Sequence, residues 1–225
     1  MDHRHLVGIF QALQLQLSDQ QAAAFEAFED ALYIANEVMN LTRVPKDECI
    51  VRHIADSLTV SPFISHGLRV LDIGCGPGFP AWPLACARPD LTVTAMDSSG
   101  KMLGFLEKNR CRNLATLQAR AEDRPFDGAM DVTTGRAVAP LGIQIELSAR
   151  PLKVGGFVLP MRTPADLEGV KSFPADVLGL ELEDIHSIEV PTTDVVRLLP
   201  VFRKVKPTPR QYPRSWAEIR RSPLH

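Results

Sequence analysis

Apolar and polar residues alternate along the chain with two different periods, and the change of period divides it into parts. Over residues 6–60, alanines and large apolar residues recur near helical spacing, which predicts helices. We expect Ser18 or Asp19 to cap the helix that carries most of them. Over residues 68–205, short apolar runs typical of strands alternate with helical patterns. This order predicts a helical extension followed by an α/β domain.

The alternating part predicts a mainly parallel sheet with helices on both of its faces. Strands are expected at residues 70–73, 91–96, 115–119, 130–134, 156–159, 182–190 and 195–205. Helices between them are expected at residues 78–87, 99–113 and 141–152. Only residues 191–194 separate the last two strands, so these strands are expected to form an antiparallel hairpin.

The first strand runs directly into a turn with three glycines at alternate positions, Gly74, Gly76 and Gly78. Glycines permit positive φ and let a ligand lie against the backbone. A dinucleotide site uses the spacing G-x-G-x-x-G, whereas here G-x-G-x-G is followed by Phe79. This spacing fits S-adenosylmethionine better, because that cofactor has no phosphate to neutralise. An ordinary tight turn is the alternative, but one turn rarely needs three glycines.

The second strand ends at Asp97, about as far from the first glycine as a ribose-binding acid is expected in such folds. A carboxylate there can accept hydrogen bonds from both ribose hydroxyls. Alternatively, Asp97 caps the helix expected to start at Ser98 and Ser99, and the two roles are compatible. Because strand, glycine turn, helix and acid arrive in order, the ribose role is favoured.

These features predict a Rossmann-like class I S-adenosylmethionine-dependent methyltransferase fold, with a mostly parallel sheet, a terminal antiparallel hairpin and an N-terminal helical extension. The expected parts are the helical extension (residues 1–64), the methyltransferase domain (residues 65–206) and a basic C-terminal tail (residues 207–225), packed as one compact unit. With 225 residues, 45% of them hydrophobic, the chain can bury a core of this size.

Composition excludes several other classes of protein. No apolar run reaches the length of a membrane span, and the first residues, MDHRH, do not form a signal peptide. We therefore expect a soluble, cytoplasmic protein with no membrane partner. The four cysteines form no C-x-x-C pair, so neither a zinc site nor a disulfide framework is expected, and we predict no metal.

The net charge of -2 hides an uneven distribution. Residues 203–225 contain seven basic residues and one acidic residue, a net +6, so the other 202 residues sum to -8. Tyr212 and Trp216 lie among these charges and offer planar groups on which a base could stack. Charge runs alone prove little, so an RNA-binding tail and a solvated tail that docks through its aromatic residues are equal alternatives on charge alone.

Short motifs outside the glycine turn give a more specific signal. In chain order they are Asn40-Leu41-Thr42, Arg52-His53-Ile54-Ala55-Asp56-Ser57-Leu58, Asp97-Ser98 with Lys101, Gly135-Arg136-Ala137, Thr208-Pro209 and Tyr212-Pro213-Arg214. With these motifs, residues 40–224 resemble the bacterial 16S ribosomal RNA guanine-N7 methyltransferases, a family also called glucose-inhibited division protein B. Many methyltransferases share the glycine turn, but the motifs near the two ends are far more specific.

The resemblance implies methyl transfer from S-adenosylmethionine to N7 of a specific guanine in 16S ribosomal RNA, with the RNA held in the 30S subunit or a precursor of it. It implies cofactor contacts from Gly74, Gly76, Gly78, Phe79, Asp97, Ser98, Ala121, Glu122 and Arg136. Together with the charge pattern, it implies RNA contacts from Lys101, Arg162, Arg203, Lys206, Arg210, Tyr212, Arg214 and Trp216.

Two of the implied contacts have ordinary alternatives. Without the resemblance, Glu122 is more simply a surface charge before a loop. Arg136 is expected just past the fourth strand, at the carboxyl edge where open α/β sheets bind ligands. Its guanidinium can grip the cofactor carboxylate or an RNA phosphate as a planar fork, and a structural ion pair is the second interpretation.

Arg136 and His53 are the candidate catalytic residues. Arg52 and Asp56 stand at i and i+4, where they can form an ion pair on a helix, and His53 beside them suggests an acid/base role. Guanine N7, however, carries a free lone pair and no proton, so the chemistry does not demand a base. A structural or substrate-positioning role for His53 is therefore favoured, and positioning should supply most of the catalysis.

The chain departs from the family pattern at a few positions. Ala81 replaces a usual glycine, Met102 stands where arginine is expected after Lys101, Arg162 ends a strand that usually ends in Lys-Gly, and Ser215-Trp216 replaces a smaller pair. Two other functions stay open: a small-molecule methyltransferase with a dispensable tail, and a non-catalytic RNA-binding protein without cofactor affinity. A dehydrogenase is disfavoured by the glycine spacing.

Overall fold

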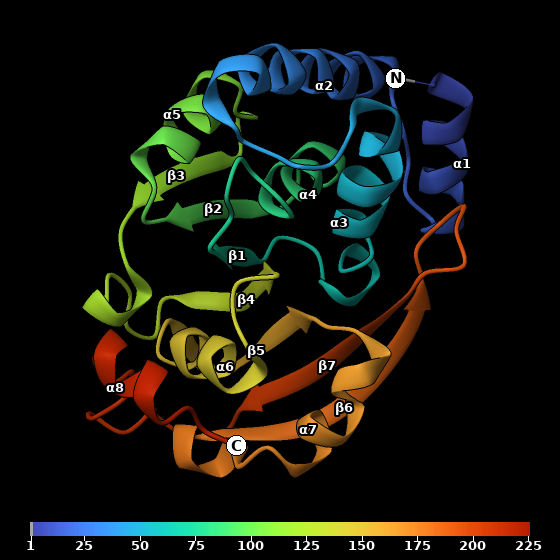
Figure 1. Cartoon of the computed structure of the whole chain (residues 1–225). Coiled ribbons are helices and arrows are strands. Elements are labelled where there is room, and N and C mark those ends of the chain that lie inside the picture. Colours follow the sequence, from blue (N-terminus) through green and yellow to red (C-terminus); the bar gives the residue numbers. More distant parts are fainter. Residues whose placement is uncertain (1) are drawn as a thin grey trace.

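The computed structural model describes residues 2–225, and their strands form a seven-stranded sheet of order β3-β2-β1-β4-β5-β7-β6 (Figure 1). Strands β1 to β5 run parallel, and β7 is antiparallel to both β5 and β6. The predicted parallel sheet with a terminal hairpin is therefore confirmed. The strands are β1 (Arg69–Ile73), β2 (Thr92–Asp97), β3 (Leu114–Gln118), β4 (Met130–Arg136), β5 (Leu152–Met161), β6 (Leu180–Glu189) and β7 (Val196–Lys204).

Helices pack on both faces of the sheet, because successive strand residues point to opposite sides. In β1, Val70 packs with the buried residues of α1, α2, α4 and α5, whereas Leu71 packs with those of α6 and α8. The helices are α1 (His3–Ala12), α2 (Asp19–Met39), α3 (Asp56–Leu58), α4 (Ala81–Ala87), α5 (Gly100–Lys108), α6 (Leu141–Ala149), α7 (Leu167–Ser172) and α8 (Trp216–Arg221). None of the helices described is long and apolar enough to cross a membrane.

Several element boundaries differ from the predictions for local reasons. Helix α4 starts at Ala81 and not at Gly78, because Gly78 has a φ of 123°, which no helix accommodates. Strand β5 is longer than predicted, since the Gly155-Gly156 pair lies inside it and does not end it. Ser18 caps α2 in a capping box with Gln21.

The C-terminal tail folds back onto the domain. Arg214 makes a two-pronged ion pair with Glu146 of α6, whose side chain is fully buried, at distances down to 2.6 Å. In α8, Ile219 is fully buried among residues of β1, β2 and α6. The tail is thus attached to the same edge of the sheet that carries the glycine turn, as Figure 1 shows for α8.

Candidate active site

The glycine turn lies where β1 ends, at the carboxyl edge of the parallel strands. All three of its glycines have positive φ. A Cβ on Gly78 would lie 2.8 Å from Leu106 of α5, so only glycine lets the turn approach this helix. A Cβ on Gly76 would meet nothing within 4 Å, which leaves open space in front of the backbone. The turn is therefore packed closely against α5 at Gly78 and faces open space at Gly76, so that a ligand can lie against its backbone.

A cavity of about 210 Å³, here called the glycine-turn cavity, opens beside this loop. Loops after β1, β2 and β3 form it, so it collects residues from three neighbouring strand ends. Its lining includes Gly74, Asp97, Ser98, Ala119, Ala121, Glu122, Val138, Leu147 and Trp216. Five of the predicted cofactor contacts thus come together here, and Trp216 joins them from the C-terminal tail.

Asp97 holds the cavity in shape through both of its carboxylate oxygens. One oxygen accepts a hydrogen bond from the Gly76 N–H at 2.9 Å, and the other accepts from the Ser99 N–H at 2.8 Å. Ser99, not Asp97, is the N-cap of α5, so the capping alternative is wrong. Each oxygen of a carboxylate can accept two hydrogen bonds, which leaves Asp97 able to bind a pair of ligand hydroxyls.

Sequence reasoning missed Asp72, an acid inside the apolar strand β1. Its side chain is fully buried; one oxygen accepts from the Ala81 N–H at 2.9 Å, and the other has no partner among residues 2–225. Burial raises the pKa of Asp72 to about 8. A carboxyl group in an otherwise apolar strand was the signal available in the sequence.

Asp72 is expected to make stability fall with rising pH. The folded protein keeps the Asp72 proton up to a pKa of about 8, whereas an unfolded chain releases it near 3.8. Between these values the folded state binds more protons, so the contribution of Asp72 to the free energy of unfolding falls by up to about 1.4 kcal/mol per pH unit. When the free energy of unfolding is measured with urea from pH 5 to 8, it should fall less steeply with pH in Asp72→Asn than in the wild type. Identical slopes in Asp72→Asn, wild type and an exposed control, Asp123→Asn, would contradict this.

Arg136 ends β4 at the centre of a cluster of charged side chains. Its guanidinium donates to Asp56 at 3.0 Å, to the Arg52 carbonyl oxygen at 2.5 Å and to His53 Nδ1 at 2.9 Å. Arg197 of β7 donates to both oxygens of the same Asp56, at 2.6 and 3.0 Å. One buried carboxylate therefore holds two arginines from different strands.

The predicted ion pair between Arg52 and Asp56 is wrong. Arg52 instead pairs with Glu48 at 2.6 Å on an exposed face, while Asp56 is buried against the two strand arginines. The backbone over Ile50–Ala55 is a π-helix that continues directly into α3 at Asp56. Asp56 is held by Arg136 and Arg197, which come from the sheet, whereas the Arg52 side chain is exposed.

His53 is buried, neutral and fully hydrogen-bonded. Its Nδ1 accepts from Arg136, so Nε2 carries the proton and donates to Thr42 Oγ1 at 2.7 Å. Its ring stacks on Phe79, with centroids 4.1 Å apart. Burial, followed by the charges of Arg136 and Arg52, lowers the pKa of His53 to about 3. At neutral pH this imidazole is suited to positioning Arg136 and not to exchanging protons.

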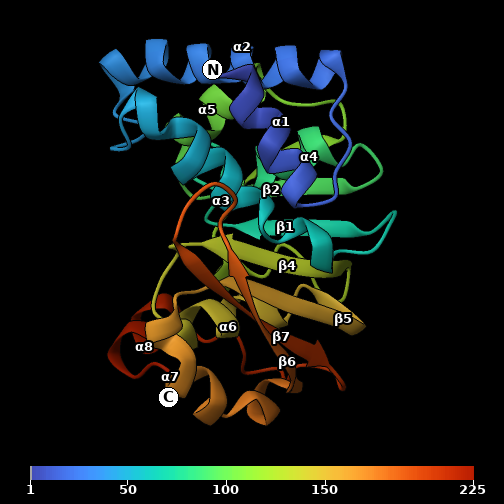
Figure 2. The ribbon, with the colours of Figure 1, turned by 90° about the vertical axis from the view of Figure 1, so that its right-hand side faces the viewer.

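A second cavity, of about 370 Å³, lies against this cluster and is called here the arginine cavity. Its lining includes Val51, His53, Asp56, Arg136, Val190, Val195 and Arg197. Figure 2 shows the β6–β7 hairpin reaching the side of α1 and α3, which brings Arg197 to Asp56. Sequence reasoning missed Arg197, because nothing in a strand pattern shows where the far end of a hairpin lies.

Phe79 links the glycine turn to the charged cluster, although it lines neither cavity. The ring is buried directly after the glycine turn, stacks on His53 and lies 5.4 Å from the guanidinium carbon of Arg136. Displacement of Phe79 would therefore move both the glycine turn and the charged cluster.

The predicted RNA contacts differ in exposure and in their protein partners. Three of the arginines have protein partners: Arg162 pairs with Asp166, Arg203 with Glu183 and Arg214 with Glu146. Lys101 donates to the Met39 carbonyl oxygen at 2.6 Å, and Tyr212 is half-buried. Lys206 and Arg210 are exposed, as are Arg220 and Arg221 of α8.

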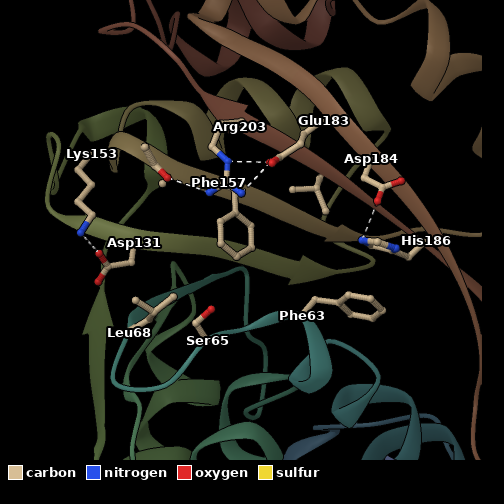
Figure 3. A pocket seen from close by; sticks show the side chains of 13 residues that line it. Phe63, Ser65, Leu68, Asp131, Lys153, Phe157, Glu183, Asp184, His186 and Arg203 are labelled. Atoms are coloured by element: carbon tan, nitrogen blue, oxygen red, sulfur yellow. Dashed lines mark hydrogen bonds and ion pairs between the residues drawn. The ribbon is translucent and has the colours of Figure 1, made fainter.

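A third cavity, of about 440 Å³, lies at the opposite edge of the sheet (Figure 3). It contains Arg203, which pairs with Glu183 and lies over the ring of Phe157, 4.9 Å from its centre. Lys153 pairs with Asp131 at the same edge. None of the predicted cofactor residues lines this cavity. Within residues 2–225, no group of three His, Cys, Asp or Glu side chains is arranged to hold a metal ion.

Comparisons with known proteins identify what the chain is similar to. A family model described as rRNA small subunit methyltransferase G matches residues 21–193. The ribosomal RNA small subunit methyltransferase G of Acetivibrio thermocellus is 34% identical over 221 residues, which cover 93% of this chain and 91% of the relative. The protein of that name from Bacillus subtilis is 33% identical and covers 93% of both chains. A solved TehB-like SAM-dependent methyltransferase from Corynebacterium glutamicum has a TM-score of 0.55 at 18% identity, covers 78% of this chain and 98% of that chain, and shows the fold alone.

Proposed function

The chain belongs to the rRNA small subunit methyltransferase G family, and on this premise we propose that it transfers a methyl group from S-adenosylmethionine to N7 of a guanine in 16S ribosomal RNA. The family predicted from the sequence motifs is confirmed. The observation that carries the proposal is the glycine-turn cavity, which brings Gly74, Asp97 and Ala121 together one strand away from Arg136.

The residues of the glycine-turn cavity fit the cofactor. S-adenosylmethionine supplies an electrophilic methyl group on a sulfonium sulfur. In the proposed arrangement, Asp97 accepts from the ribose hydroxyls, the backbone of the glycine turn faces the open space beside Gly76, and Ala121 and Glu122 flank the adenine. The half-satisfied carboxyl group of Asp72 lies behind the turn, where it can position the loop through Ala81.

Arg136 is proposed to face the methionine end of the cofactor. The strand order places β4 beside β1 and on the side away from β2 and β3, so Arg136 lies across the glycine turn from Asp97 and Glu122. Asp56 and His53 fix the guanidinium from two directions. Because the guanidinium group of Arg136 is already fixed, it can bind a carboxylate or a phosphate with little further loss of side-chain entropy.

The arginine cavity is proposed to receive the target guanine. Arg136 and Arg197 bring two positive charges to it against the single carboxylate of Asp56, while Arg52 in the lining is paired with Glu48. The net positive charge suits the phosphate of a splayed nucleotide. N7 needs no deprotonation, so the protein has to hold base and methyl group in line and exclude water. A neutral His53 agrees with a site that positions the reactants and does not need a general base. We propose no metal.

The exposed basic residues of the tail and α8 are proposed to contact RNA outside the cavity. Lys206, Arg210, Arg220 and Arg221 are exposed, whereas Arg203 and Arg214 are engaged by acids of the protein. We propose the 30S subunit or a precursor as the substrate, in the bacterial cytoplasm where ribosomal RNA is assembled. The negative remainder of the chain disfavours indiscriminate binding to RNA.

Transfer of tritium from labelled S-adenosylmethionine tests this proposal. Unmodified 30S subunits and bare 16S RNA are each incubated with the protein, and borohydride with aniline then cleaves the RNA at N7-methylguanine. We expect label in 16S RNA and cleavage at one site, and about 100-fold slower transfer by Arg136→Ala. Cofactor binding without transfer to either RNA would contradict the ribosomal substrate and favour a small-molecule acceptor.

A further inference from the structure

Trp216 lies at the cofactor site although it comes from the last ten residues of the chain. It is the first residue of α8 and lines the glycine-turn cavity with Ala121, Glu122 and Leu147. Its side chain keeps 36% of its surface exposed, which is uncommon for so large an apolar group. On its sequence alone, Trp216 was predicted to contact RNA; its position indicates a different ligand.

Three features hold Trp216 in this place. Ser215 caps α8 in a reciprocal capping box with Glu218, and Ile219 is fully buried one turn further along. Arg214, two residues before Trp216, is fixed by its ion pair with the buried Glu146 of α6. The position of the indole is therefore set by buried groups and not by a flexible terminus.

The tail is also attached to the loop that follows β3. Arg124 donates to the Pro213 carbonyl oxygen at 3.0 Å, and Ala121 and Ile219 belong to one buried cluster. Figure 1 shows α8 next to this loop. Trp216 thus borders the end of the cavity formed by β3, farthest from Arg136 along the strand order β3-β2-β1-β4.

In the proposed arrangement, the adenine, which is the planar and apolar part of S-adenosylmethionine, lies at that end of the cavity. With the ribose at Asp97, the adenine extends toward β3, between Ala121 and the indole. Purines stack on aromatic side chains, and a partly exposed tryptophan gains most by being covered in this way. Among the residues that line this end, Trp216 supplies the aromatic face.

We propose that the indole of Trp216 packs against the adenine of S-adenosylmethionine and S-adenosylhomocysteine, so that the C-terminal tail is part of the cofactor site. This inference rests on the proposed methyltransferase function and extends it. Binding of the cofactor then also stabilises the docked tail, because the ligand bridges it to the loop after β3.

Calorimetric titration with S-adenosylhomocysteine tests the contact without requiring catalysis. Trp216→Ala is expected to weaken binding about tenfold, and Trp216→Phe, which keeps a ring, to stay within about threefold of wild type. Thermal unfolding of each variant shows whether α8 remains docked. If Trp216→Ala unfolds, Trp216→Leu keeps the apolar volume without a stacking face and should weaken binding by about threefold to tenfold.

Tryptophan fluorescence gives a second, direct readout. The chain has two tryptophans, and the other, Trp82, is 2% exposed beneath α2. S-adenosylhomocysteine should change the emission of the wild type and protect it from acrylamide quenching. In Trp216→Phe, where Trp82 alone emits, neither change is expected although the ligand still binds.

The outcomes separate this inference from the function on which it rests. If the wild type fails to bind S-adenosylhomocysteine, the proposed function itself is wrong. If the wild type binds it, but Trp216→Ala binds equally well and the fluorescence of Trp216 does not respond, the adenine contact is wrong. Normal cofactor affinity of Trp216→Ala with weakened binding of 16S RNA would also overturn it, and would restore the RNA role predicted from the sequence.

Discussion

Replacing Asp97 with alanine is expected to weaken binding of S-adenosylhomocysteine by about 100-fold or more. The substitution removes the acceptor proposed for both ribose hydroxyls, and each charge-assisted hydrogen bond contributes about 1.5–3 kcal/mol. It also frees the Gly76 and Ser99 N–H groups, which loosens the glycine turn and the start of α5. Calorimetric titration measures the affinity directly, and methyl transfer at saturating cofactor should recover only in part.

Two further variants test whether the loss of affinity comes from the acceptor that Asp97 provides. Asp97→Asn keeps one oxygen acceptor and is expected to bind more tightly than Asp97→Ala. Asp123→Ala removes an exposed acid from the neighbouring loop after β3 and should leave the affinity unchanged. If Asp97→Ala binds S-adenosylhomocysteine as tightly as Asp123→Ala does, the ribose assignment is wrong.

Replacing Asp56 with alanine is expected to destabilise the protein by about 3 kcal/mol and to abolish most methyl transfer. Asp56 is 3% exposed and accepts three hydrogen bonds from Arg136 and Arg197. Without it, two adjacent guanidinium groups lose their common partner in a largely buried place, and removal of one partner from a buried ion pair costs about 3–5 kcal/mol. Arg136 would also lose one of its three hydrogen-bond partners, which are Asp56, His53 and the Arg52 carbonyl oxygen.

Urea unfolding and methyl transfer, both measured at a temperature where the variant is folded, check this expectation. The matched control is Glu168→Ala, since the pair of Glu168 with Lys171 is exposed on both sides. Such surface pairs contribute less than about 1 kcal/mol. Equal free energies of unfolding for Asp56→Ala and Glu168→Ala would show that the cluster does not hold the hairpin to the helical extension.

The local chemistry of the glycine turn could be predicted from the sequence because neighbouring residues decide it. Positive φ at Gly74, Gly76 and Gly78 follows from the need to turn sharply after a buried strand, and an acid at the end of the next parallel strand must lie at the same edge. The same reasoning located the strands, since the period of apolar residues depends only on which way successive side chains point.

The partners of charged residues could not be predicted in this way. Asp56 and Arg197 are 141 residues apart, and Arg214 and Glu146 are 68 apart. The spacing of residues predicted a local partner for Asp56, but arginines of β4 and β7 hold this carboxylate. Arg214 was counted as a free charge, although the buried carboxylate of Glu146 holds it. Each of these pairs forms because sheet and hairpin bring distant segments together.

The sequence by itself therefore determined the fold, the cofactor turn and the family, because sterics, periodicity and short motifs act over a few residues. Only the tertiary structure decided which charges are paired, that His53 is neutral, and that Trp216 lines the glycine-turn cavity. Burial and ion pairing depend on what the whole chain packs against each group, and that environment is absent until the sheet, the helical extension and the tail have assembled.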